Sequence, residues 1–168
     1  MLKTLETVTK AQSKLYAECG IKIENFAPEK ESSEYYAHTC LIQSKKILFR
    51  IAKKTPTKTG WFVTIWKRGA DNIIAPYDES DSVDFVVVAI INNNNIGQFI
   101  FPKSILLKKT IFSTNNEGGK RAIRVYSSSD ETANAQAIKT QKWQNQYFVD
   151  LTSKNSENIS RIKTLYCT

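Results

Sequence analysis

The chain has 168 residues, 41% of them hydrophobic, so it can bury a sizeable core and is not expected to be disordered. Its 24 lysines and arginines exceed its 16 acids and leave a formal net charge of +8. This excess of positive charge favours an anionic partner such as nucleic acid, acidic lipid or acidic protein.

Three features of the sequence indicate the cellular compartment of the protein. The longest apolar run, at 85–91, is too short to span a bilayer, and the N-terminus lacks the apolar core of a signal peptide. The three cysteines are odd in number and have no zinc or redox spacing, which suits a reducing compartment. We expect a cytoplasmic protein with one domain over residues 1–168 and no membrane partner.

The first third of the chain predicts one helix followed by strands. Residues 3–19 carry apolar side chains near one helical face and end at Gly20, and residues 21–26 alternate as a strand does. Residues 27–34 are a polar loop. The next strand is predicted at 46–52 (KILFRIA). Its residues Ile47, Phe49 and Ile51 lie on one face, whereas Leu48 and Arg50 lie on the other.

The centre of the chain predicts further strands. WFVTIW at 61–66 has a β-branched or aromatic residue at every position, and residues 84–91 are apolar on both faces, which indicates mid-sheet. The asparagines at 92–95 and Gly97 are expected to form a loose loop that turns the chain into a hairpin partner at 98–102. One helical turn near 104–112 and a strand at 121–126 follow.

The C-terminal third predicts two helices. The polar run at 127–134 offers N-cap residues, and Trp143, Tyr147 and Leu151 recur at helical spacing within 133–151. A shorter helix is expected at about 157–166. The predicted class is α+β: a curved, mostly antiparallel (mixed) central sheet with N-terminal and C-terminal helices.

Positive and negative charges are segregated along the sequence, and this pattern is the main evidence for the predicted function. No acid occurs from Tyr35 to Ala70 or from Phe85 to Asn116, whereas five acids fall within 71–84. Segregated positive charge attracts a polyanion, and aromatic rings beside it can stack on unpaired bases. The predicted nucleic-acid-binding residues are Lys53, Lys54, Lys58, Lys67, Arg68, Lys103, Lys120, Arg121 and Arg124. Trp66 is the stacking candidate, because Val63 and Ile65 place Trp61 on the more apolar side of its strand.

The sequence offers little for catalysis, and no cofactor is expected. P-loop, GxGxxG and GxSxG motifs are absent, and His38, the only histidine, has no evident catalytic partner. The main alternative is a metal-dependent nuclease that uses Asp81, Asp84 and Lys103. Phe101 stands where such a site needs an acid two residues before the lysine, so we expect no catalysis. A second alternative is a module that reads an acidic protein.

Five spaced blocks carry a family resemblance: WKR at 66–68, PYDESDSVDF at 76–85, GQFIFPKSIL at 97–106, GKRAIRVY at 119–126 and QAIKTQKWQNQYF at 136–148. In this order they resemble the MepB family of small bacterial proteins, over about residues 35–151. One member is encoded beside a multidrug efflux pump and its repressor in staphylococci. Ser127-Ser128-Ser129 departs from the proline-rich, tryptophan-containing turn that follows RVY in the family.

The resemblance implies a cytoplasmic protein without an established enzymatic activity, related in architecture to the DNA-binding parts of restriction endonucleases. It assigns no catalytic residue. Together with the charge pattern it leads us to expect sequence-tolerant binding of single- or double-stranded DNA, with RNA as a further candidate partner.

Overall fold

The computed structural model describes the backbone of residues 2–167 and the side chains of residues 3–167. A six-stranded mixed sheet forms its centre, and only the pair of β3 and β8 is parallel. This confirms the α+β class and the mid-sheet position of β8. In spatial order the strands are β1 (Ile23–Pro28), β2 (His38–Ile42), β3 (Lys45–Ile51), β8 (Phe85–Asn92), β9 (Asn95–Pro102) and β11 (Phe148–Asp150).

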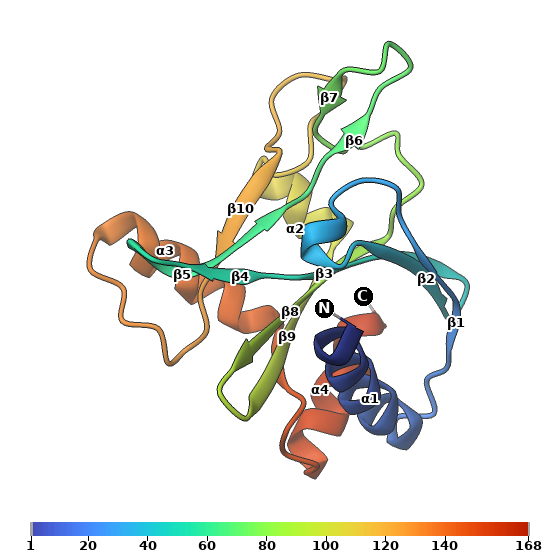
Figure 1. The fold of residues 1–168 in the computed structure, drawn as a ribbon, viewed down its shortest axis with the longest axis vertical. Coiled ribbons are helices and arrows are strands. Elements are labelled where there is room, and N and C mark those ends of the chain that lie inside the picture. Colours follow the sequence, from blue (N-terminus) through green and yellow to red (C-terminus); the bar gives the residue numbers. More distant parts are fainter. Residues whose placement is uncertain (1, 168) are drawn as a thin grey trace.

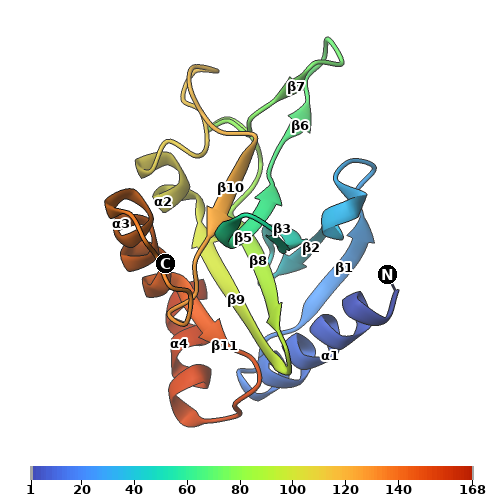
Figure 2. The same cartoon turned by 60° about the vertical axis from the view of Figure 1, so that its left-hand side comes forward.

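Two helices cover one face of this sheet. α1 (Leu2–Glu18) and α4 (Ser156–Tyr166) lie side by side at the lower end of the molecule (Figures 1 and 2). They pack on Ile47, Phe49 and Ile51 of β3, as the alternation of that strand predicted. The hydroxyl groups of Tyr16 and Tyr166 meet at 2.8 Å within this core and join the two helices.

A second, three-stranded sheet covers the other face. Its order is β10 (Ala122–Val125), β5 (Lys58–Thr64) and β4 (Lys53–Thr55). Trp61 and Val63 of β5 and Ile123 and Val125 of β10 are buried in one cluster with even-numbered residues of β3 and β8. α2 (Lys103–Lys108) and α3 (Ala135–Gln144) flank β10 (Figure 2). The inner face of this small sheet is thus core, and its opposite face is available for function.

A small hairpin projects from the top of the molecule in Figure 1. It consists of β6 (Lys67–Arg68) and β7 (Ile74–Ala75), and Ile73 at its tip is 65% exposed. Two short 3₁₀ helices complete the fold, η1 (Ser33–Tyr35) and η2 (Asn145–Tyr147). In the described part of the chain, no helix is both long and apolar enough to cross a membrane.

The structure corrects three expectations. The helix expected over 133–151 ends at Gln144, because residues 148–150 pair with β9 and extend the sheet. The strand expected at 61–66 ends at Thr64, so Trp66 lies beyond it. The asparagine turn is tight: Asn92 and Asn95 pair directly, and Asn93 adopts a left-handed φ of 56°.

Candidate nucleic-acid interface

The three-stranded sheet presents a row of side chains on the face that points away from the core. Lys53 of β4 lies opposite Phe62 of β5, and Phe62 lies opposite Arg124 of β10. Residues that pair directly across strands project from the same side, as do alternate residues along one strand. We call this side, with the neighbouring ring of Tyr35, the outer sheet face; it comprises Lys53, Lys58, Phe62, Arg124, Tyr126 and Tyr35.

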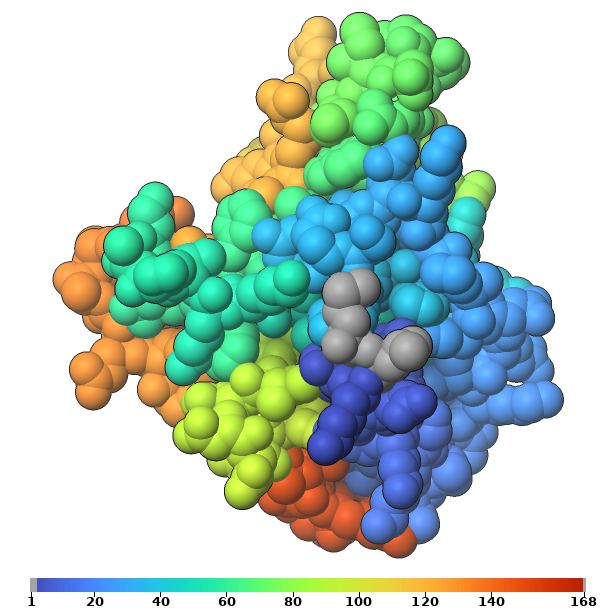
Figure 3. All heavy atoms as spheres, in the orientation of Figure 1, coloured from blue at the N-terminus to red at the C-terminus, as the bar shows by residue number. Residues whose placement is uncertain are grey.

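Aromatic rings and cations alternate on the outer sheet face. The rings of Tyr35 and Phe62 meet edge to face with centroids 6.0 Å apart. The Lys53 ammonium lies 5.3 Å from the Tyr35 centroid, and the Arg124 guanidinium carbon lies 5.7 Å from the Phe62 centroid. Such a surface can stack bases and bind phosphates at once. In Figure 3 the β4–β5 hairpin projects at the left of the molecule, beside the segment around η1.

Arg124 is held by the hairpin that it crosses. Its Nη2 donates to the Thr55 hydroxyl at 2.8 Å, and its Nη1 lies 3.4 Å from the carbonyl oxygens of residues 58–60. The Tyr126 ring lies so close to Gly60 that a Cβ on residue 60 would be only 2.6 Å from this ring. Gly60 also has a φ of +83°, which favours glycine. These contacts fix the shape of the outer sheet face.

Lys54 belongs to the opposite side of the small sheet. Its ammonium lies 4.8 Å from the centroid of Trp61, which is only 5% exposed, and 3.5 Å from the Asn92 side-chain oxygen. The expectation that Trp61 faces the core is confirmed. Lys54 remains exposed at the rim of the hairpin, and the structure describes no ion pair for Lys53, Lys54 or Lys58.

Three other predicted cations are held within the protein. Lys67 donates to the Asp81 carboxylate at 2.6 Å, and Lys103 donates to the Asp81 backbone carbonyl at 2.6 Å. Arg68 donates to the Glu31 carboxylate at 2.6 Å. Asp81 and Glu31 neutralise part of the positive charge. Lys67, Lys103 and Arg68 are therefore expected to attract phosphate less strongly than lysines without an acid nearby.

Trp66 lies just beyond the end of β5, next to Arg68. Its ring is half-buried, and the Arg68 guanidinium carbon lies 5.6 Å from the ring centroid. This contact is of the same kind as those of Arg124 with Phe62 and of Lys53 with Tyr35. Trp66 therefore stays a predicted stacking residue, at the end of β5 next to the β6–β7 hairpin.

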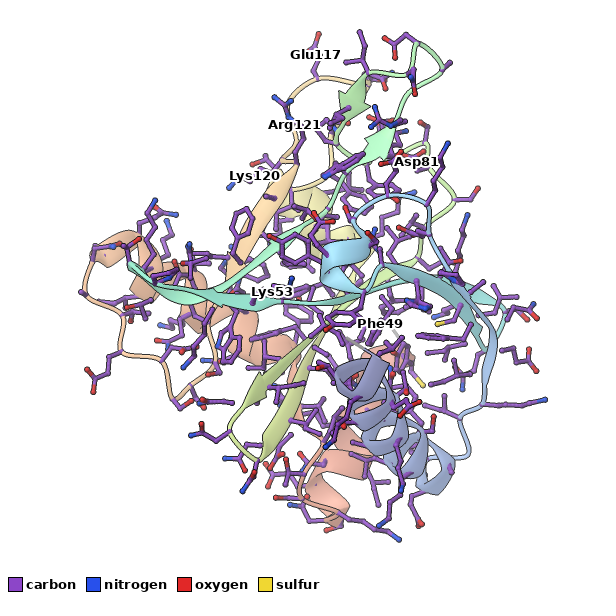
Figure 4. The ribbon with its side chains drawn as sticks, viewed as in Figure 1. Phe49, Lys53, Asp81, Glu117, Lys120 and Arg121 are labelled. Carbon is purple, nitrogen blue, oxygen red and sulfur yellow. The ribbon has the colours of Figure 1, made fainter. Side chains whose placement is uncertain are left out.

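Lys120 and Arg121 are both exposed and precede β10. In the view of Figure 4 they lie on the opposite side of β6 from Asp81. Lys120 lines a pocket together with Arg124, so the structure brings these two predicted residues together. The predicted cations thus form two sets. Those around the small sheet have no described acid partner, whereas Lys67, Arg68 and Lys103 donate to Asp81 or Glu31 beside the β6–β7 hairpin.

The residues of the nuclease alternative are used in hydrogen bonds. The Asp84 carboxylate accepts the Lys46 amide at 2.7 Å, and the Asp81 carboxylate accepts the Asp78 amide at 2.7 Å besides Lys67. Phe101 is fully buried. Over residues 2–167 no three His, Cys, Asp or Glu side chains lie close enough together to hold a metal ion.

The acidic segment has a structural role that centres on Asp78. Its buried carboxylate accepts the Ser80 amide at 3.0 Å and hydroxyl at 2.7 Å, and then the Asn116 amide and the Ser113 hydroxyl. These hydrogen bonds, the Ser80 amide foremost, hold the pKa of Asp78 well below its usual range. Asp78 thereby ties the loop at 113–117 to the segment at 78–80.

We expect this tie to depend on pH. Because the folded pKa is lowered, its contribution is present above the unfolded pKa of about 4 and is lost as the pH falls towards the folded value. Asp78→Asn should unfold at lower urea concentration than wild type at neutral pH, with a smaller difference at acidic pH. Glu131→Gln, at an exposed site, is the matched control. An equal effect of both substitutions would contradict the tie.

Sequence reasoning missed the aromatic members of the outer sheet face. Phe62 has the opposite parity to Trp61 and Val63, so the alternation already assigned it to the non-core side. Tyr35 is 27 positions from Phe62 in the sequence, and only the fold brings the two rings together. No local pattern indicates that contact.

Comparisons with known proteins agree with the five sequence blocks. A family model described as MepB-like matches residues 29–150. A solved structure described as the crystal structure of MepB has a TM-score of 0.76 at 33% identity, covering 86% of this chain and 99% of that chain. A bacterial homing endonuclease structure has a TM-score of 0.47 at 12% identity, covering 82% and 86%. Comparison with curated proteins gave no match. This chain therefore belongs to the MepB-like family.

Proposed function

We propose that the protein is a cytoplasmic, sequence-tolerant nucleic-acid-binding protein that holds DNA against the outer sheet face. The observation that carries this proposal is the row of Lys53, Phe62 and Arg124 across three adjacent strands, with the Tyr35 ring beside it. Cations at these spacings neutralise phosphates, and half-exposed rings stack on any base because every base has a π face.

Several further features support this surface. Lys53, Lys54 and Lys58 are exposed on one hairpin without a described acid partner, and Lys120 and Arg121 lie near the start of β10. Stacking requires unpaired bases, so single-stranded DNA should bind more tightly than duplex DNA. The three cysteines are free, which suits the cytoplasm.

The salt dependence of binding tests the proposal directly. Fluorescence anisotropy with labelled single-stranded DNA, double-stranded DNA and RNA should show binding that weakens steeply as salt rises. Phe62→Leu should weaken single-stranded binding by ~1–3 kcal/mol, because it removes a stacking ring, and should affect duplex binding less. Phe26→Leu is the matched control, since Phe26 is half-buried and stacks on His38, away from the outer sheet face.

Three outcomes would defeat the proposal. The first is no binding at low salt, the second is binding that salt does not change, and the third is an equal loss in Phe62→Leu and Phe26→Leu. Salt-sensitive binding to acidic proteins alone would instead favour the interaction module.

We also expect no nuclease activity. The carboxylates of Asp81 and Asp84 already accept hydrogen bonds, and phosphodiester cleavage needs a metal held by more than one oxygen ligand. Linear DNA, supercoiled DNA and RNA incubated with magnesium or manganese should stay intact. Cleavage that is lost in Asp84→Ala would support the nuclease alternative.

A further inference from the structure

A basic pocket lies between α2, β10 and α3, next to the outer sheet face. Its volume is about 460 Å³, which is in the size range of small-molecule sites. Among the residues described for its lining, none is an aspartate or a glutamate. The lining does include five cations: Lys108, Lys109, Lys120, Arg124 and Lys139.

Three of these cations converge without a described acid partner. Lys108 ends α2, Lys120 precedes β10 and Lys139 lies on α3, and none of them occurs in an ion pair of residues 3–167. Like charges that converge on a hollow repel one another and raise the local positive potential. An anion bound between them would relieve this repulsion. Phosphate fits because lysine is a common phosphate-binding residue.

One wall of the pocket is aromatic. The Lys109 ammonium lies 5.5 Å from the Trp143 centroid, and contacts with Phe101 and Tyr147 hold the ring from the core side. Gln136 and Thr140 precede Trp143 by seven and three positions, so all three lie near one face of α3. An aromatic ring with amide and hydroxyl groups beside it suits a nucleobase.

The pocket is formed before any ligand arrives. The Gln144 side chain donates to the Arg124 carbonyl at 2.9 Å and accepts the Tyr126 amide at 2.9 Å, which fixes α3 to the edge of β10. The Lys120 amide donates to the Ile111 carbonyl at 2.8 Å and fixes the approach to β10 beside the end of α2. A preformed site loses less conformational entropy when it binds a ligand.

We propose that this pocket binds a nucleoside phosphate, with the phosphate among Lys108, Lys120 and Lys139 and the base against Trp143. The same chemistry is offered by a free nucleotide and by the phosphorylated end of a nucleic-acid strand. The strand-end source rests on the proposed nucleic-acid binding, because the strand would continue onto the adjoining outer sheet face. Free-nucleotide binding stands without it.

Calorimetry at low salt with AMP, inorganic phosphate and adenosine tests the pocket. AMP should bind at least about tenfold more tightly than phosphate or adenosine, because it alone uses both ends of the site. Lys108→Gln/Lys139→Gln should weaken AMP binding about tenfold or more. Lys142→Gln, an exposed lysine of α3 outside the pocket, is the matched control and should bind as wild type does. In NMR spectra AMP should shift the Trp143 indole signal, identified by Trp143→Phe, and leave those of Trp61 and Trp66 in place.

Oligonucleotides with and without a 5′-phosphate distinguish the two sources. A preference for the phosphorylated strand that disappears in Lys108→Gln/Lys139→Gln assigns the pocket to strand ends, and AMP binding without that preference assigns it to free nucleotides. Loss of oligonucleotide binding alone would refute the proposed function and leave the AMP result intact. AMP that binds no more tightly than phosphate, or equally to the double variant and to Lys142→Gln, would overturn the nucleotide pocket.

Discussion

Replacing Arg50 with alanine is expected to lower the free energy of unfolding by about 3–5 kcal/mol. Arg50 is fully buried in β3, where its Nη2 donates to the Glu29 carboxylate at 2.5 Å and its Nη1 donates to the Phe49 carbonyl at 2.8 Å. Removing the guanidinium leaves an acid with only 16% of its side chain exposed and no partner there. Urea unfolding monitored by circular dichroism measures the loss.

Two further variants separate charge pairing from packing. Glu29→Ala should cost a similar amount, because it leaves the buried guanidinium unpaired. Arg50→Met/Glu29→Leu should cost less than either single substitution, because it removes both charges and keeps apolar volume. Lys154→Ala breaks an exposed pair with Glu18 and should cost less than about 1 kcal/mol. A cost for Arg50→Ala as small as that for Lys154→Ala would contradict the buried pair.

The hairpin variant Lys53→Gln/Lys54→Gln/Lys58→Gln is expected to weaken single-stranded DNA binding about 10- to 100-fold at low salt. If each lysine contacts one phosphate, the slope of log affinity against log salt should fall by about 2. These side chains are exposed, and only their weak contacts with Tyr35, Trp61 and Asn92 are lost, so the fold should survive. Anisotropy across a salt series measures both quantities.

The matched control is Lys3→Gln/Lys10→Gln/Lys14→Gln, which removes the same charge from exposed positions on α1. α1 packs on the face of the central sheet opposite to the one that the β4–β5 hairpin covers. Equal losses in both triple variants would mean that only net charge matters, and the outer sheet face would be wrong as the binding surface.

The effect of replacing the remaining predicted cations on DNA binding should depend on whether each cation has an acid partner. Lys120→Gln/Arg121→Gln should weaken DNA binding more than Lys67→Gln/Arg68→Gln, because Asp81 and Glu31 already neutralise the latter pair. The reverse order would place the DNA against the β6–β7 hairpin instead.

Local sequence determined most of the elements. The alternation of Ile47, Phe49 and Ile51 and the unbroken apolar run of β8 predicted which faces are buried, because burial on one or both faces leaves a period of two or none. The helices at the two ends and the parity of Trp61 followed from the same reasoning. The five spaced blocks indicated the MepB-like family that the comparisons then showed.

The tertiary structure decided what each charged residue does. Arg50 reads as one more cation in an acid-free stretch, yet Glu29, 21 positions away, pairs with it inside the protein. Residues 148–150 continue a helical pattern but form β11, because pairing with β9 satisfies their backbone in the sheet. Whether a lysine is free or paired depends on residues distant in the chain, so no local pattern separates Lys53 from Lys67. The grouping of Tyr35, Phe62 and Arg124 likewise exists only once two strands and a 3₁₀ helix have come together.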